Sequence, residues 1–128
     1  MESRAMSRSK IPTEAELERA SALADERARH LDDVREAVLA RFRSRGLQEF
    51  LILDQIDVDF RAYAFVARDA DIEALHRSGL DRELSDFVYA ELERRGRGSH
   101  DQIRVAFEFD STENVDANFR GSYYLRAR

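Results

Sequence analysis

Residues 13–46, TEAELERASALADERARHLDDVREAVLARFRSRG, decide the fold, because they carry one unbroken helical pattern. Thr13 and Glu16 have the spacing of a capping box, in which each side chain satisfies a backbone N–H that the first helical turn leaves unpaired. The sequence therefore predicts a helix over residues 13–45, with Gly46 as its C-terminal stop. Apolar residues recur along it every three or four positions, as on one helical stripe: Leu17, Ala20, Ala24, Ala28, Leu31, Val34, Val38 and Phe42.

This predicted helix is longer than the rest of the chain can cover. About 32 residues at 1.5 Å per residue span about 48 Å, whereas the remaining residues would form a body about 30 Å across. Either the helix bends around its own core, or another surface covers the overhanging stripe. Because closed two-fold dimers are the commonest oligomers, we weigh a homodimer equally with a bent helix. The dimer contacts would then be Leu17, Ala24, Leu31 and Val38.

Alternation of apolar and polar residues predicts two strands in the second half of the chain. The first covers residues 56–65 and the second covers residues 103–110. A dense apolar run at residues 47–53 fits either a buried strand or a helical turn. A last short strand is predicted at residues 122–126, after Gly121.

Further helices are indicated by polar residues that can cap them, each followed by apolar residues at helical spacing. The expected helices run from Asp69 through Leu75, from Ser78 and Asp81 through Leu92, and from Asp110 or Ser111 to Phe119, the last as a turn or a short helix.

These elements predict an α+β fold with a long N-terminal amphipathic helix. The expected sheet is small and mainly antiparallel, with about three strands covered by two or three helices. A strand, two helices and a strand can also form a parallel crossover unit, so the strand order stays open. We expect a flexible polar tail over residues 1–12 and a single domain over residues 13–128. Since neither a secretory signal nor a membrane-length apolar run is present in this sequence, we expect a cytoplasmic protein without a membrane partner.

Composition excludes several classes of chemistry. The chain of 128 residues has no cysteine, which removes disulfide scaffolds, cysteine-based zinc sites and thiol nucleophiles. The net charge of −5 opposes non-specific binding of nucleic acid. Lys10 is the single lysine among 21 basic residues, a bias that indicates a GC-rich, bacterial coding sequence. No phosphate-binding loop or serine nucleophile motif is present.

An acidic pattern follows the two alternating strands. Asp57 and Asp59 share one side of the first strand, and Glu108 and Asp110 share one side of the second. If the strands are neighbours, these four carboxylates gather on one outer surface. That surface is either a solvated sheet face paired with interleaved arginines, a docking surface for a basic protein, or a Mg²⁺ or Mn²⁺ site of a hydrolase with His100 as general base.

The C-terminal segment adds a second candidate contact surface. Tyr123, Tyr124 and Arg126 belong to the residue types that carry binding energy at protein interfaces. The same residues, together with the arginines at the helix ends, permit an alternative role in RNA binding. The negative net charge opposes that role.

These observations favour a non-catalytic, bacterial, cytoplasmic protein that acts by binding another protein and forms a homodimer. A narrower hypothesis is an acidic inhibitor of the immunity type, which would neutralise a basic toxin or nuclease. The alternatives are a metal-dependent hydrolase that uses the strand carboxylates and an RNA-associated protein. We expect no catalytic residues, no cofactor and no bound metal.

Overall fold

The computed structural model describes residues 11–55 and 57–128, and the chain divides into two compact units, residues 1–30 and residues 31–128. Most of the expected tail, residues 1–10, and the expected strand residue 56 lie outside the described residues. Residues 11 and 12 are exposed.

The predicted long helix is confirmed. Helix α2 covers Glu14–Phe42 and continues as a short 3₁₀ turn, η1, over Arg43–Arg45. Its capping box is formed, since the Thr13 N–H donates to Glu16 at 2.8 Å and the Glu16 N–H donates to the Thr13 hydroxyl at 3.1 Å. Gly46 ends it with a φ of 105°, a conformation that glycine adopts without strain. The helix crosses the boundary between the two units.

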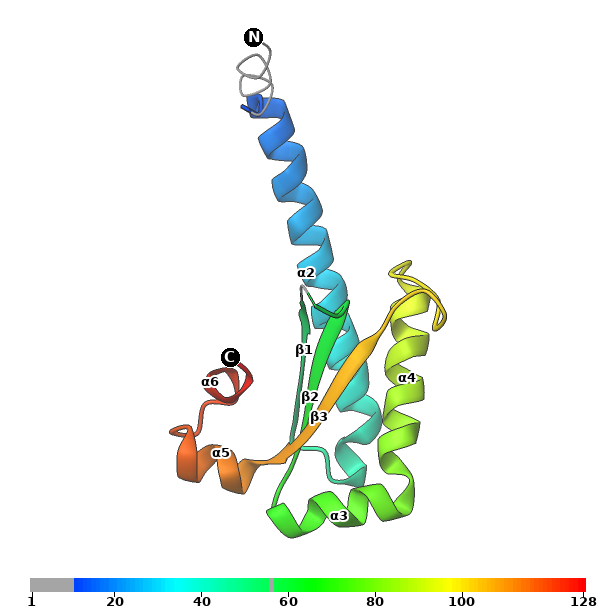
Figure 1. Ribbon diagram of the computed structural model, residues 1–128, viewed down its shortest axis with the longest axis vertical. Helices are drawn as coiled ribbons and strands as arrows, with labels where there is room; N and C mark the ends of the chain where they lie inside the picture. The colour runs from blue at the N-terminus through cyan, green and yellow to red at the C-terminus, as the bar shows by residue number, and fades with distance from the viewer. Residues whose placement is uncertain (1–10, 56) are drawn as a thin grey trace. The chain divides into compact units, whose positions relative to one another are not determined.

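The sheet has three strands in the order β1-β2-β3 (Figure 1). Strand β1 covers Glu49–Asp54, β2 covers Phe60–Val66 and β3 covers Val105–Ser111. The expected α+β class and strand number are confirmed, but the sheet is mixed: β1 pairs with β2 antiparallel, and β2 pairs with β3 parallel. The parallel pair uses the crossover that the sequence left open, through helices α3 (Asp69–Ser78) and α4 (Leu80–Arg94).

One side of the sheet, which we call the core face, packs against α3, α4 and the residues of α2 that belong to the second unit. Side chains of the three strands that share this face pair across the register, for example Ile52 with Ala62 and Ala62 with Phe107. The most deeply buried helical side chains of this core are Val34, Val38, Phe42, Leu84, Val88 and Leu92.

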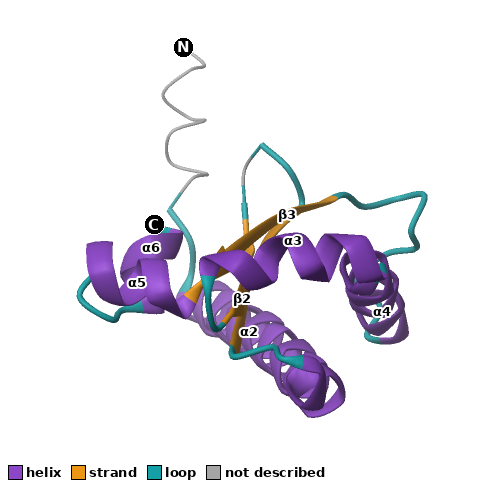
Figure 2. Cartoon of the chain, turned by 90° about the horizontal axis from the view of Figure 1, so that it is seen from below, coloured by secondary structure: helices purple, strands orange, loops and turns teal. Residues whose placement is uncertain are grey.

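The opposite side of the sheet, which we call the outer face, is partly covered by two short helices. Helix α5 covers Thr112–Asn118 and α6 covers Tyr123–Ala127, both gathered at one side of the strands in Figure 2. A second apolar cluster forms there from Leu51, Tyr63, Phe65, Val115 and Ala127.

The prediction of a last strand at residues 122–126 is wrong, because this segment is helix α6. The Ser122 hydroxyl caps the helix by accepting the Leu125 N–H at 3.1 Å. The Tyr63 hydroxyl on β2 donates to the Ala127 carbonyl at 3.0 Å. One local cap and one tertiary hydrogen bond on a five-residue segment therefore outweigh its weak alternating pattern. The remaining strand of the sheet is β1, which forms from the apolar run that fitted either a strand or a helical turn.

The first predicted strand is shorter than its alternating pattern. Strand β2 begins at Phe60, so Asp57 and Asp59 lie in the turn before it. Each aspartate satisfies a backbone N–H, Asp57 that of Val58 at 3.1 Å and Asp59 that of Arg104 at 2.8 Å. The bond of Asp57 is local, as is typical of aspartate in turns, whereas that of Asp59 reaches the residue just before β3.

Candidate functional site

Three of the four predicted carboxylates lie in one ion-pair network with two arginines. Arg61 on β2 joins Asp57, at 3.3 Å, to Glu108 on β3, at 3.4 Å. Arg126 on α6 joins Glu108, at 3.2 Å, to Asp110. The network therefore alternates in charge in the order Asp57, Arg61, Glu108, Arg126 and Asp110. The prediction that these carboxylates gather was conditional on neighbouring strands, and the β2–β3 pair provides that condition.

Asp110 is the most enclosed member of the ion-pair network. Its carboxylate accepts hydrogen bonds from the Ser111 N–H at 2.8 Å and from the Asn114 amide at 2.9 Å, besides its pairing with Arg126. Burial alone would raise the pKa of Asp110, but Arg126 and these two donors outweigh it and hold the pKa below its ordinary value. The carboxylate is thus held ionised by its own fold, which suits a structural role.

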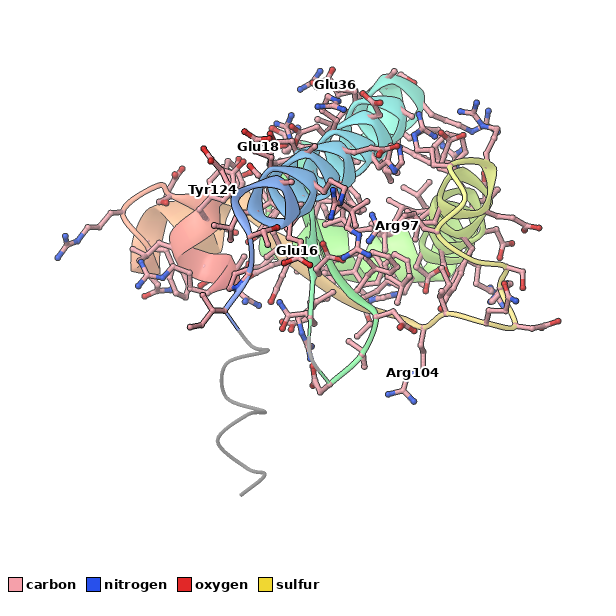
Figure 3. All side chains as sticks on the ribbon, turned by 90° about the horizontal axis from the view of Figure 1, so that it is seen from above. Glu16, Glu18, Glu36, Arg97, Arg104 and Tyr124 are labelled. Atoms are coloured by element: carbon pink, nitrogen blue, oxygen red, sulfur yellow. The ribbon has the colours of Figure 1, made fainter. Side chains whose placement is uncertain are left out.

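Asp59 lies outside this network, at the end of the sheet where β2 and β3 begin. It bonds the backbone N–H of Arg104, whose side chain points away from the sheet (Figure 3). Arg97 is turned inward, with its guanidinium 4.9 Å from the centre of the Phe60 ring and 3.0 Å from Asp54. This end of the sheet is therefore built from opposite charges as well. The four predicted carboxylates therefore do not form one patch of unpaired negative charge.

The predicted C-terminal residues have three different environments. Tyr123 packs edge-to-face on Phe65 at 4.8 Å, and its hydroxyl lies 2.8 Å from that of Thr112. Arg126 is engaged by Glu108 and Asp110. Tyr124 is 64% exposed, so of these three residues it offers the most free surface.

The predicted dimer stripe divides between the two units. Leu31 and Val38 are buried in the core of the second unit, so they contribute to folding. Leu17 and Ala24 belong to the first unit, in which residues 11–29 are all exposed. Leu23 is exposed as well, at 49%, compared with 55% for Leu17.

The three histidines do not form a catalytic set. His76 bonds Asp81 at 2.8 Å, which lowers the pKa of that carboxyl, and His30 lies 3.8 Å from Glu26. His100, the candidate general base, stacks on Tyr89 with ring centres 3.8 Å apart. Among residues 11–55 and 57–128, no group of three or more His, Asp or Glu side chains is placed to hold a metal ion.

A cavity of about 340 Å³ lies where α3 meets the end of β2. Its lining includes Val66, Leu75 and Leu80, together with the charged residues Arg45 and Asp71. Both charged side chains are already paired, Arg45 with Glu83 and Asp71 with Arg68.

Sequence reasoning missed a row of aromatic rings along β3 on the core face. We call this the aromatic row: it connects His76, Phe109, Phe107, Tyr89 and His100 by neighbouring ring distances between 3.8 and 6.4 Å. Phe107, Phe109 and Tyr89 are partly exposed, although all three pack against the main core. The alternation at residues 105–109 was a signal for the two phenylalanines, but their exposure depends on β3 lying at the edge of the sheet.

No protein-family model matches the chain, and no curated protein or solved structure gives a significant match. In the described part of the chain, no helix is long and apolar enough to cross a membrane.

Proposed function

We propose that this protein acts by binding another protein. One observation carries the proposal: Phe107, Phe109 and Tyr89 remain partly exposed at an edge of the sheet. Neighbouring aromatic rings that pack on the core and still stay partly exposed offer the kind of side chain that is enriched at protein contact surfaces. The cavity and the ion-pair network, in contrast, have their charged groups paired internally.

The narrower proposal is an inhibitor of a basic toxin or nuclease. It is supported by the net charge of −5, since an acidic protein is steered toward a basic partner and association then weakens with salt. Because Asp57, Glu108 and Asp110 are paired with arginines, this steering would come from the whole chain more than from one patch.

A purification from the host tests the protein-binding proposal. The tagged chain is recovered at about 0.1 M and about 1 M salt, conditions that keep or screen surface electrostatics, and co-purifying proteins are identified. We expect a stoichiometric protein partner at low salt, with a basic isoelectric point if the narrower proposal holds. Phe107→Ala should release the partner, and Tyr124→Ala serves as the comparison on the C-terminal surface. Recovery of the chain alone at low salt would contradict the proposal.

We also propose that the chain self-associates through the helical segment of its first unit. Residues 14–30 have acidic side chains at Glu14, Glu16 and Glu18, followed by Arg19, whereas their second half carries both signs, with Asp25 and Glu26 beside Arg27 and Arg29. An antiparallel pair of these segments brings Arg27 and Arg29 of one copy near the first glutamates of the other, with Leu17 covered between them.

A further inference from the structure

Strand β3 has one edge that faces away from β2. At the ends of this edge, the backbone N–H groups are hydrogen-bonded to side chains, whereas those at its centre are available to a further strand. In the parallel pair, the Arg104 carbonyl accepts the Phe60 N–H at 3.1 Å, so Arg104 points its backbone groups toward β2. The direction of the backbone groups alternates along a strand. The N–H and C=O groups of Val105, Phe107, Phe109 and Ser111 therefore point away from β2. The Val105 N–H is taken by the Tyr89 hydroxyl at 2.9 Å and the Ser111 N–H by Asp110 at 2.8 Å. Phe107 and Phe109 are left with outward N–H and C=O groups that none of the residues 11–55 and 57–128 bonds.

The other edge of the sheet is less accessible. Phe50, Leu51 and Ile52 in the middle of β1 are buried, whereas all five residues between Val105 and Ser111 are partly exposed. The start of β1 is also closed, since Arg35 of α2 holds Glu49 with two bonds of 2.8 and 2.9 Å. An added strand would therefore pair with β3 in preference to β1.

We propose that β3 receives an extended segment of the partner protein as a fourth, antiparallel strand, with a basic residue opposite Glu108 and apolar residues on either side of it. This inference rests on the proposed protein-binding function and names its site. Antiparallel pairing lets the two partner residues opposite Phe107 and Phe109 exchange both backbone hydrogen bonds with them.

The face of the sheet on which each residue of the added strand lies determines the type of side chain that fits there. Residues opposite Phe107 and Phe109 lie on the core face, beside the aromatic row, where an apolar side chain gains buried area. The residue between them lies on the outer face, opposite Glu108, whose side chain is 38% exposed and already pairs with Arg61 and Arg126. The ion-pair network holds three carboxylates against two arginines, so a basic residue that faces Glu108 supplies the positive charge that the network lacks. The recognised pattern is therefore apolar, basic, apolar.

A second copy of this chain fits the same edge poorly. The self-pairing that uses all open groups of Phe107 and Phe109 is centred on Glu108 and places the two Glu108 carboxylates opposite each other. Centring the pair on Phe107 requires the Val105 N–H, which Tyr89 already occupies. Centring it on Phe109 requires the Ser111 N–H, which Asp110 occupies. The geometry thus favours a different chain.

Two capped peptides test the proposed site directly: GSTVKVTSG, with the apolar-basic-apolar pattern, and GSTVEVTSG as its charge-reversed control. Backbone amide NMR of the full chain follows each titration. The largest shifts are expected at the Phe107 and Phe109 amides, with the lysine peptide bound about two- to five-fold more tightly, the range of a facing charge pair. In Glu108→Lys this order should reverse. Equal binding of both peptides, or shifts centred elsewhere, would overturn the proposal.

Phe107→Pro removes the outward N–H without removing a donor to β2, and Phe107→Ala is its matched control because it also loses the ring but keeps the N–H. The proline variant should bind the lysine peptide at least about five-fold more weakly than the alanine variant, which corresponds to about one hydrogen bond. A host partner retained by a folded Phe107→Pro chain would refute the site and leave the protein-binding function standing. Absence of any host partner, together with normal peptide binding, would refute the proposed function and leave the site standing.

Discussion

At the scale of single residues, Asp110 shows how the outer face is stabilised. Its carboxylate is 13% exposed and is bonded by Arg126, Asn114 and the Ser111 N–H. Asp110→Asn keeps the shape and loses the charge, so we expect a loss of about 1–3 kcal/mol in the free energy of unfolding at pH 7. Urea denaturation measures it. Asp116→Asn, an exposed aspartate on α5, is the matched control, with an expected change within about 0.5 kcal/mol.

The same residue makes a prediction about pH. Because the pKa of Asp110 is lowered in the folded state, the stability it contributes is complete above the unfolded pKa of about 3.9 and is lost as the pH falls through the folded pKa. The difference in stability between the native chain and Asp110→Asn should therefore be constant above about pH 5 and shrink below about pH 4. A difference that grows on acidification would contradict the assigned role of the carboxylate.

At the scale of elements, α6 depends on its contacts more than on its own sequence. A five-residue helix is too short to be stable alone, and the bond from Tyr63 to the Ala127 carbonyl ties its end to β2. Tyr63→Phe removes this hydrogen bond and should lower the free energy that holds α6 on the sheet by about 1 kcal/mol. Hydrogen exchange of the Arg126 amide should therefore accelerate about five-fold. The matched control is Tyr124→Phe, since this tyrosine is 64% exposed. Equal exchange in both variants would show that Tyr63 does not tether α6.

The elements also show which signals a sequence can carry. Helix α2 was predictable because Thr13, Glu16 and Gly46 fix its ends locally. Strand β1 was not, because an apolar run of that length fits two states and only pairing with β2 decides between them. In the candidate site, Glu108 and Asp110 were predictable from alternation. Arg126, which neutralises both, was predicted as a strand residue with a role at an interface, and its contacts depend on a tertiary fold that places α6 on the outer face.

At the scale of the whole molecule, the remaining question is what covers the helix of the first unit. Residues 11–29 are exposed, although packing of an apolar stripe supplies most of the stability of a helix in water. We therefore expect light scattering to give a mass near twice 14.8 kDa, measured between about 10 μM and 1 mM because an interface of this size is weak. Leu17→Glu places a charge in the stripe and should return the mass to that of one chain. Ala22→Glu, turned about 140° away on the same helix, should leave the dimer intact. A native chain that stays monomeric throughout this range would end the proposal, because the exposed segment would then be helical without a partner copy.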